Sequence, residues 1–300
     1  MATGKTKIKS GDISRIITIT VALIAAIYAL VTYFRGDDST DKSAVNADTE
    51  VHFVDVGQGD ATLVLSGAEA MLIDTGERDD YKTLVKYLKD EKIKALKYLI
   101  ITHPHSDHMG EASDVLESFD VEKVIMPKVT GDMVPTSSVY KKFLKTVQNQ
   151  GKKITAAKDE SFKLGNTDIE LFTPKQAHDD LNNISTLVKI KHGDNSFLIT
   201  GDCEKEEEKD FLNQNADISA KVLKAGHHGS RTSNTDAFLK KVAPEYAVVS
   251  CGNGNSYGHP HDITVKRLKK YASHYYCTVD SGSIVFQSDG KGLTVKTERQ

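Results

Sequence analysis

One stretch of the sequence decides the fold: Tyr98-Leu99-Ile100-Ile101-Thr102-His103-Pro104-His105-Ser106-Asp107-His108-Met109-Gly110-Glu111. Four apolar or β-branched residues lead directly into a turn that holds three histidines and an aspartate. A short apolar run bounded by a turn is typical of a buried strand, and helix-compatible residues begin at Glu111. The cluster is therefore predicted on a strand-to-helix loop, where α/β sheets commonly hold their ligand sites.

The spacing within this cluster suits metal binding. His103 and His105 are two positions apart, so both imidazoles can face one metal ion. Asp107 and His108 are adjacent and can reach a second ion beside it. Imidazole suits zinc, iron and related ions, and the carboxylate adds charge for a divalent ion. The alternative is a surface loop that is rich in histidine by chance, which so dense a cluster after an apolar strand disfavours.

The pattern His-x-His-x-Asp-His, preceded by Thr102, resembles the metal-binding signature of the metallo-β-lactamase fold superfamily. Two further segments, Val54-Asp-Val-Gly-Gln-Gly-Asp-Ala61 and Lys224-Ala-Gly-His-His-Gly-Ser230, resemble its ComEC branch, the extracellular hydrolase domain of competence proteins and its stand-alone relatives. The resemblance covers about residues 50–288. It implies an α/β fold, the αββα sandwich, with the site along one edge of the sheets. The motifs are specific to superfamily and branch, but not to a substrate.

The chain before residue 49 is predicted to anchor the protein in a membrane. Ile16 to Phe34 carry no charge, and 19 helical residues nearly span the hydrocarbon layer. Basic residues in 1–15 indicate a cytoplasmic tail by the positive-inside rule. Residues 35–48 are polar and predict a flexible linker. The hydrolase domain, residues 49–300, is then expected outside the cell, on a single-pass anchor. The alternatives are a cleaved signal peptide, whose apolar region is normally shorter, and a buried core helix.

Composition limits the function classes. Hydrophobic content of 39% and charged content of 27% are ordinary for a globular chain. The net charge is −3; because residues 1–15 contribute +3, the remainder carries −6, unlike the broad basic surface of a tight nucleic-acid binder. The spacing of Cys203, Cys251 and Cys277 matches no zinc motif, and we expect most of these cysteines to be small buried side chains. An oxidising exterior would allow one disulfide.

The rest of the chain alternates between short apolar runs and amphipathic segments. Strands are expected at 51–56, 61–65, 71–74, 98–101, 123–126, 168–172, 186–190, 197–200, 220–224, 246–249, 277–279 and 283–287. Helices are expected at 81–88, 115–119, 139–147, 204–212, 237–242 and 263–271. Two sheets packed face to face with helices outside would bury all of these runs.

Two more strand ends carry candidate ligands. Asp202 follows the strand at 197–200 and a glycine, which suits a carboxylate that bridges two cations; the alternative is an N-cap for the helix at 204–212. His227 and His228 follow another strand, and their side chains are expected to diverge from an extended backbone. One of the two is predicted to bind metal, and the other to orient a group or to meet substrate. We favour His228 as the metal ligand and His227 as the catalytic candidate, and the assignment between them stays open. Ser230 either holds the leaving group or caps the next segment.

A late cluster, Gly258-His-Pro-His-Asp262, resembles the family's His-Pro motif before a helix. His259 is predicted either to protonate a leaving oxygen or to complete the metal shell, and His261 is the weaker candidate. Early in the chain, Asp60 and Asp74 are candidates for orienting a ligand histidine. The alternative for both is turn chemistry beside glycine.

One feature departs from the general superfamily pattern. Many members carry a further metal-binding histidine between the first cluster and the bridging aspartate. The candidates in that interval, His178 and His192, follow no strand-end motif. Instead, a segment around Asn183 resembles the Asn-x-Ser segment of the ComEC branch, so Asn183 is expected near the site. The missing histidine leaves the ligand number of the first metal open and disfavours β-lactam or lactone hydrolysis.

These residues predict a metallohydrolase with two divalent ions, zinc or manganese, that share Asp202. The expected reaction is phosphodiester cleavage, with Asp107, His227 and His259 as the candidate catalytic residues. Extracellular DNA is the first expected substrate, because the ComEC branch is tied to DNA uptake. The alternatives are a phosphocholine esterase acting on cell-wall polymers and a non-catalytic component of DNA uptake. The complete set of candidate ligands argues against the non-catalytic role.

Overall fold

The structure is a computed structural model that describes residues 48–79 and 82–299. The predicted tail at 1–15, the membrane segment at 16–34 and all of the linker before residue 48 lie outside these residues. Within the described ranges, no helix combines the length and the apolar character that crossing a bilayer requires. The described residues, from 48 onward, group as one compact unit.

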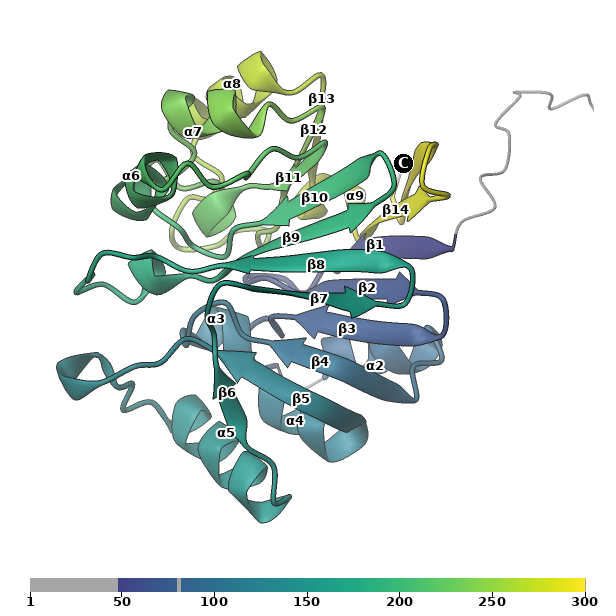
Figure 1. The fold of residues 1–300 in the computed structure, drawn as a ribbon, viewed down its shortest axis with the longest axis vertical. Coiled ribbons are helices and arrows are strands. Elements are labelled where there is room, and N and C mark those ends of the chain that lie inside the picture. Colours follow the sequence, from purple (N-terminus) through teal and green to yellow (C-terminus); the bar gives the residue numbers. More distant parts are fainter. Residues whose placement is uncertain (1–47, 80–81, 300) are drawn as a thin grey trace, which may run out of the picture. The chain divides into compact units, whose positions relative to one another are not determined.

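Two sheets form the centre of this unit (Figure 1). Sheet 1 has the order β15-β14-β1-β2-β3-β4-β5-β6, and sheet 2 has the order β13-β12-β11-β10-β9-β8-β7. Sheet 1 comprises β1 (Thr49–Phe53), β2 (Thr62–Ser66), β3 (Glu69–Ile73), β4 (Ala95–Ile100), β5 (Asp120–Met126), β6 (Ile154–Ala156), β14 (Ile284–Ser288) and β15 (Leu293–Thr297). Sheet 2 comprises β7 (Glu160–Leu164), β8 (Thr167–Phe172), β9 (Leu187–His192), β10 (Asn195–Ile199), β11 (Val222–Lys224), β12 (Tyr246–Val249) and β13 (His274–Cys277). Neighbouring strands from β3 to β6 and from β10 to β13 are parallel.

Helices cover the outer face of each sheet. Sheet 1 carries α2 (Thr83–Asp90), α4 (Ala112–Ser118) and α5 (Ser138–Asn149), whereas sheet 2 carries α6 (Lys205–Asn213), α7 (Asp236–Val242) and α8 (Asp262–Tyr271). Short helical turns are α3 (Ser106–Met109), η1 (Gly131–Met133), η2 (Asn182–Ile184), η3 (Gly226–Gly229) and α9 (Thr278–Ser281). The amphipathic pattern explains this placement: α5 buries Tyr140, Phe143 and Val147, which recur on one face.

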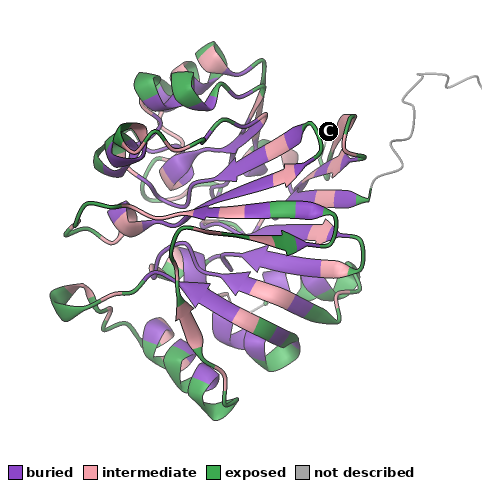
Figure 2. Ribbon diagram, viewed as in Figure 1, coloured by how far each residue is buried: buried purple, intermediate pink, exposed green. Residues whose placement is uncertain are grey.

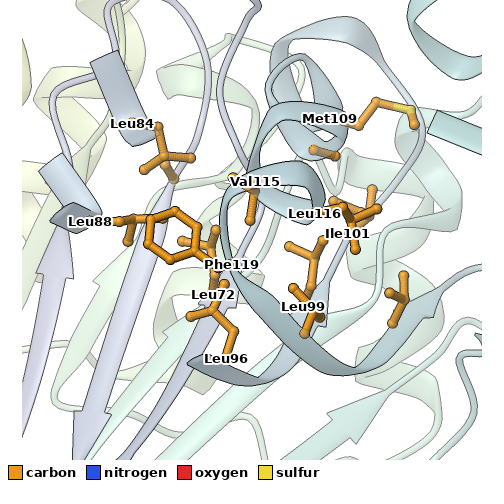
Figure 3. Close-up of a cluster of buried hydrophobic side chains, with 14 of the residues drawn as sticks. Leu72, Leu84, Leu88, Leu96, Leu99, Ile101, Met109, Val115, Leu116 and Phe119 are labelled. Carbon is orange, nitrogen blue, oxygen red and sulfur yellow. The ribbon is translucent and has the colours of Figure 1, made fainter. Parts of the chain in front are cut away.

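Three apolar layers hold the elements together. Between the sheets, Phe53 and Phe286 of sheet 1 pack with Phe197 of sheet 2. Figure 3 shows the layer between sheet 1 and its helices, where Leu88 of α2, Phe119 and Leu72 of β3 belong to one buried cluster. Figure 2 shows buried positions along the central strands and exposed ones on the outer helix faces. The chain thus has the two-sheet α/β architecture that the resemblance implies.

The sequence prediction differs from the structure mainly at the sheet edges. The strands β6, β7 and β15 were not predicted, and each is the last strand of its sheet. The strand expected at 277–279 is wrong beyond Cys277, because Thr278 begins α9. The Thr278 hydroxyl accepts from Cys251 N at 3.0 Å and donates to Cys251 O at 3.1 Å. A side chain thereby satisfies the groups that a continued strand would have paired.

Candidate metal centre

The candidate site lies where parallel strands of both sheets end. Asp74 follows β3, the His103–His108 cluster follows β4, and Asp202 follows β10. His227 and His228 form the turn η3 directly after β11. Two glycines let these loops approach: a Cβ on Gly59 would lie 2.2 Å from Asp107 O, and one on Gly201 would lie 2.7 Å from Thr102 Oγ1. Both have positive φ, which favours glycine.

Four side chains form what we call the closed donor set: Asp107, His108, Asp202 and His228. Their candidate donor atoms all lie within 4.8 Å of one another. Asp202 Oδ1 is 3.1 Å from His108 Nε2 and 3.5 Å from His228 Nε2, and Asp107 Oδ2 is 3.3 Å from His228 Nε2. All except Asp107 are buried. This is a set of nitrogen and oxygen donors that suits a divalent transition metal.

Each histidine of the closed donor set is oriented by a hydrogen bond from its Nδ1 to a buried oxygen. His108 Nδ1 lies 2.9 Å from Asp74 Oδ2, and His228 Nδ1 lies 2.9 Å from Ser250 O. Because an N–H on Nδ1 donates to each oxygen, the lone pair of Nε2 is left to face the other donors. Asp74 therefore lies where a histidine-orienting residue is expected. Asp60 Oδ1 also lies 3.3 Å from His228 Nδ1.

Unsatisfied buried atoms test whether a cation fits here. Among the described residues, His108 Nε2, His228 Nε2 and Asp202 Oδ1 are buried without a hydrogen-bond partner. Buried polar atoms are normally paired, and these three converge on one point. Burial raises the pKa of Asp202, but the His108 and His228 imidazoles outweigh it and hold the pKa well below its usual range. The carboxylate is thus ionised, and the donor set fits a divalent cation.

A second group, the open donor set, lies on the other side of Asp202. It comprises His103, His105, His227 and the second carboxylate oxygen of Asp202. His103 Nε2 is 3.0 Å from His105 Nδ1 and 3.8 Å from Asp202 Oδ2, while His227 Nε2 is 3.7 Å from the same oxygen. His227 is 22% exposed, against 1% for His228. Asp202 thus presents one oxygen to each donor set, as a bridging carboxylate would.

The turn that carries the two histidines differs from the expected extended backbone. Both residues are left-handed, with φ of 50° at His227 and 51° at His228, and this turn separates their side chains. His227 Nδ1 lies 3.0 Å from Glu204 Oε1, which also accepts from Thr232 Oγ1 at 2.7 Å. Ser230 Oγ contacts Thr232 Oγ1 at 2.9 Å. Ser230 therefore lies behind His227, in the network that orients it.

The chain between His108 and Asp202, where a further ligand histidine was sought, contributes residues that contact the site without joining either donor set. Asn183 Oδ1 accepts from Glu204 N at 3.3 Å, and Ser185 Oγ lies 3.4 Å from His103 Nδ1. His178 lies beside Asp210, and His192 contacts Ser288 and Asp48, so neither belongs to the two donor sets. The alternative role of Asp202 as a helix cap is wrong, because Glu204 occupies the N-cap position of α6.

Lys224 is a buried residue of the site that sequence reasoning missed. Its ammonium group pairs with Asp60 and lies 3.4 Å from Gly201 O. Burial raises the pKa of Asp60, but Lys224 and His228 outweigh it and lower the pKa. The signal was present: Lys224 is a charged residue at the end of an apolar strand, three residues before His227. Glu204, two residues after Asp202, was also missed.

A pocket of about 250 Å³ opens onto the donor sets. It is lined by Gln58, His105, Ser106, Asp107, Asn182, Asp202, His227, His228, Tyr257 and His259. The His259 ring is 5.3 Å from that of His227, and its buried Nδ1 has no hydrogen-bond partner among the described residues. Burial and the imidazoles of His228 and His227 lower the pKa of His259 to about 4. His261 is not among the lining residues, and its Nδ1 instead accepts from Arg231 N at 3.1 Å.

Comparison with known proteins agrees with this geometry. Residues 54–253 match the model of the metallo-beta-lactamase superfamily. The chain is 30% identical to ComE operon protein 3 of Bacillus subtilis over 81% of its own length and 33% of that protein. It is 31% identical to Recombination protein 2 of Haemophilus influenzae over 78% of its length and 28% of that protein. The chain thus spans about a third of each of these relatives.

A solved structure shows the same fold. The metallo-beta-lactamase fold protein YhfI from Bacillus subtilis superposes with a TM-score of 0.53 at 14% identity, over 80% of this chain and 100% of that one. The family match covers all three segments that form the donor sets, and the relatives are competence-related proteins of the ComEC type. The chain belongs to the metallo-beta-lactamase superfamily.

Proposed function

We propose that the protein is a metal-dependent phosphodiesterase that cleaves DNA outside the cell. The observation that carries this proposal is the pair of donor sets joined by Asp202 at the floor of a polar pocket. When bound, two divalent ions, zinc or manganese, would stabilise charge on phosphate oxygens and lower the pKa of water so that it attacks at neutral pH.

The chain's own residues divide the remaining work. Asp202 and Asp107 supply negative charge that compensates the cations. Hydrogen bonds to Asp74 and to the Ser250 carbonyl hold His108 and His228 in orientation. His259 borders the pocket beside His227. Because its pKa is about 4, the ring is neutral at pH 7, and its N–H donates a hydrogen bond to the departing oxygen. His259 is thus proposed as a neutral hydrogen-bond donor, in place of the protonated imidazolium that would transfer a proton to the leaving oxygen.

Two features support DNA as the substrate. The matched relatives include proteins named Recombination protein 2 and Competence protein ComA. Tyr257 borders the pocket, is 63% exposed and stacks on His259, with ring centroids 5.6 Å apart and an interplanar angle of 18°. An exposed aromatic face beside a phosphate site suits a nucleobase, since base stacking on aromatic side chains is common in single-strand binding.

The test uses the full chain loaded with zinc or with manganese. We expect turnover of single-stranded DNA and of a 4-nitrophenyl phosphodiester, abolished by a chelator and restored by the metal. A choline phosphodiester and a β-lactam serve as comparison substrates. Hydrolysis of the β-lactam without any phosphodiester cleavage would contradict the proposal, and turnover restricted to the choline substrate would replace DNA with phosphocholine.

The proposed location rests on the apolar segment 16–34 and the basic residues before it. Protease added to intact cells should release a fragment that begins within about residues 36–48, because the domain would then face outward. The fragment is detected with an antibody against the domain. A domain that is protected until the membrane is broken would contradict the outward orientation.

A further inference from the structure

A pair of cysteines lies directly behind the site. Cys251 follows β12 by two residues, and Cys277 is the last residue of β13, the parallel neighbour of β12. Their sulfur atoms are 3.5 Å apart, and both residues are buried. The third cysteine, Cys203, instead places its thiol 3.8 Å from Glu204 O.

We propose that Cys251 and Cys277 are a dithiol site that a disulfide-type oxidant closes into an intramolecular disulfide, which clamps the loop that orients His228. A disulfide needs sulfur atoms about 2.05 Å apart, so the sulfurs must approach by roughly 1.5 Å. The backbone at both positions is already held together by the Thr278 hydroxyl, which bonds to Cys251 N and O. Rotation of the two side chains can therefore supply the movement.

The two cysteines differ in a way that gives the reaction an order. Cys277 borders a surface pocket of about 490 Å³, whereas Cys251 is fully buried. The hydrogen bond from the Cys251 thiol lowers the pKa of Cys277 to about 7. Cys277 is thus the thiolate that an oxidant meets first, since the thiolate is the nucleophile in disulfide exchange.

The reaction balances with a small disulfide such as oxidised glutathione. The Cys277 thiolate attacks one sulfur of the oxidant, whose S–S bond breaks and releases one thiol. Cys251 then loses its proton and attacks the Cys277 sulfur, which releases the second thiol. The two protein thiols give up two electrons and two protons, and the oxidant becomes two thiols.

The position of the bond connects it to the site. The residue before Cys251 is Ser250, whose carbonyl accepts from His228 Nδ1. The residue after it is Gly252, whose N–H donates to Gln58 Oε1 at 3.1 Å. A covalent bond at Cys251 therefore restrains both the oxygen that orients a closed-set histidine and a contact to the pocket wall.

The experiment exposes the full chain in detergent to excess oxidised glutathione, then denatures it in an alkylating agent. We expect one alkylated cysteine per chain, Cys203, and a cross-linked peptide that contains Cys251 and Cys277. Three alkylated cysteines, or a bond to Cys203, would overturn the proposal.

Reduction with a phosphine should lower the melting temperature by roughly 5–15 °C, from the usual contribution of a disulfide in a domain of this size. It should also weaken Mn²⁺ binding to the closed donor set, which contains His228, by roughly three- to tenfold, less than the loss of an orienting partner costs. Cys203→Ala should keep both responses, and Cys251→Ala and Cys277→Ala should lose them. Because the wild-type chain carries the main measurement, a variant that fails to fold leaves the test intact. If the oxidised and reduced forms had equal melting temperatures and equal metal affinities, the proposal that the disulfide restrains the His228-orienting loop would be wrong.

Discussion

The two donor sets share Asp202 but differ in how firmly they are built. In the closed set, His108 and His228 are buried, each is oriented by a buried oxygen, and the donor atoms already lie within 4.8 Å of one another. In the open set, His227 and His105 are partly exposed. Asp202 Oδ2 lies 3.7 Å from His227 Nε2 and 3.8 Å from His103 Nε2.

The difference between the two donor sets follows from where their histidines come from in the chain. The closed set draws on one histidine from a strand-end segment of each sheet, His108 in α3 and His228 in η3, and both are buried. The open set includes neither His178 nor His192, the two histidines between the first cluster and Asp202. His227 lies beside Asp202 Oδ2 and comes from the turn η3. Its partner Glu204 is itself only partly buried. We infer that the closed set binds its ion first and more tightly, because less reorganisation is needed.

The largest effect is expected from Asp202→Ala, which removes the residue common to both sets. The variant should lose both ions and more activity than the roughly 10²–10³-fold that a single transition-state donor contributes. Elemental analysis and phosphodiester turnover measure the two effects. Asp236→Ala, at the exposed start of α7, is the matched control and should retain both. Full metal content in Asp202→Ala would show that the two sets are not joined by this residue.

His259→Ala tests whether the open set has another member. If the residue donates a hydrogen bond to the leaving oxygen, the rate should fall by roughly 10²–10³-fold with an alkoxide leaving group. The loss should be smaller with 4-nitrophenolate, because a stable leaving group needs less assistance, and both ions should remain.

The pH dependence separates two versions of that role. A neutral ring with a pKa of about 4 gives the same His259 contribution from pH 6 to 8. A protonated acid with that pKa would instead lose about tenfold in rate for each pH unit above it. Equal rate loss for both leaving groups, together with loss of an ion, would place His259 in the open set.

A matched pair of substitutions behind the histidines should separate the two sets. Asp74→Asn removes the charge behind His108, and Glu204→Gln removes the charge behind His227, with little change of shape. Each should weaken one ion by roughly 10–100-fold, as is usual for an orienting partner, and leave the other nearly unchanged. Mn²⁺ titration followed by calorimetry measures both affinities. If either variant weakens both ions equally, the two sets are a single cooperative unit.

The sequence predicted the residues whose chemistry follows from local position. His103 to His108, Asp202 and His228 each stand within a few residues of the end of a strand, and the structure brings them together. Lys224 was missed because its partner Asp60 is 164 residues away. Ser250 was missed for a different reason: it acts through its backbone carbonyl, which every residue has. No motif can signal such a contact.

The fold was likewise predictable where the local sequence pattern is strong, which is in the central strands. Central strands carry apolar runs because both of their faces are covered, so their sequence pattern is strong. The edge strands β6, β7 and β15 retain exposed or half-exposed positions along much of their length, and their patterns resemble loops. Antiparallel pairing with β8 and β14 nevertheless orders β7 and β15, which only the assembled sheets reveal.

The smallest effect is expected at the rim of the pocket, away from both donor sets. Tyr257→Ala should raise KM for single-stranded DNA by about tenfold, since stacking of one base contributes roughly 1–3 kcal/mol. It should leave the metal content and the turnover of a small 4-nitrophenyl phosphodiester that lacks a base unchanged, provided that the small substrate occupies only the pocket floor. Tyr257→Phe keeps the aromatic face and should behave as the wild type, which separates stacking from the hydroxyl. A loss of metal in Tyr257→Ala would mean that the rim supports the open set through His259, and the division between floor and rim would then be wrong.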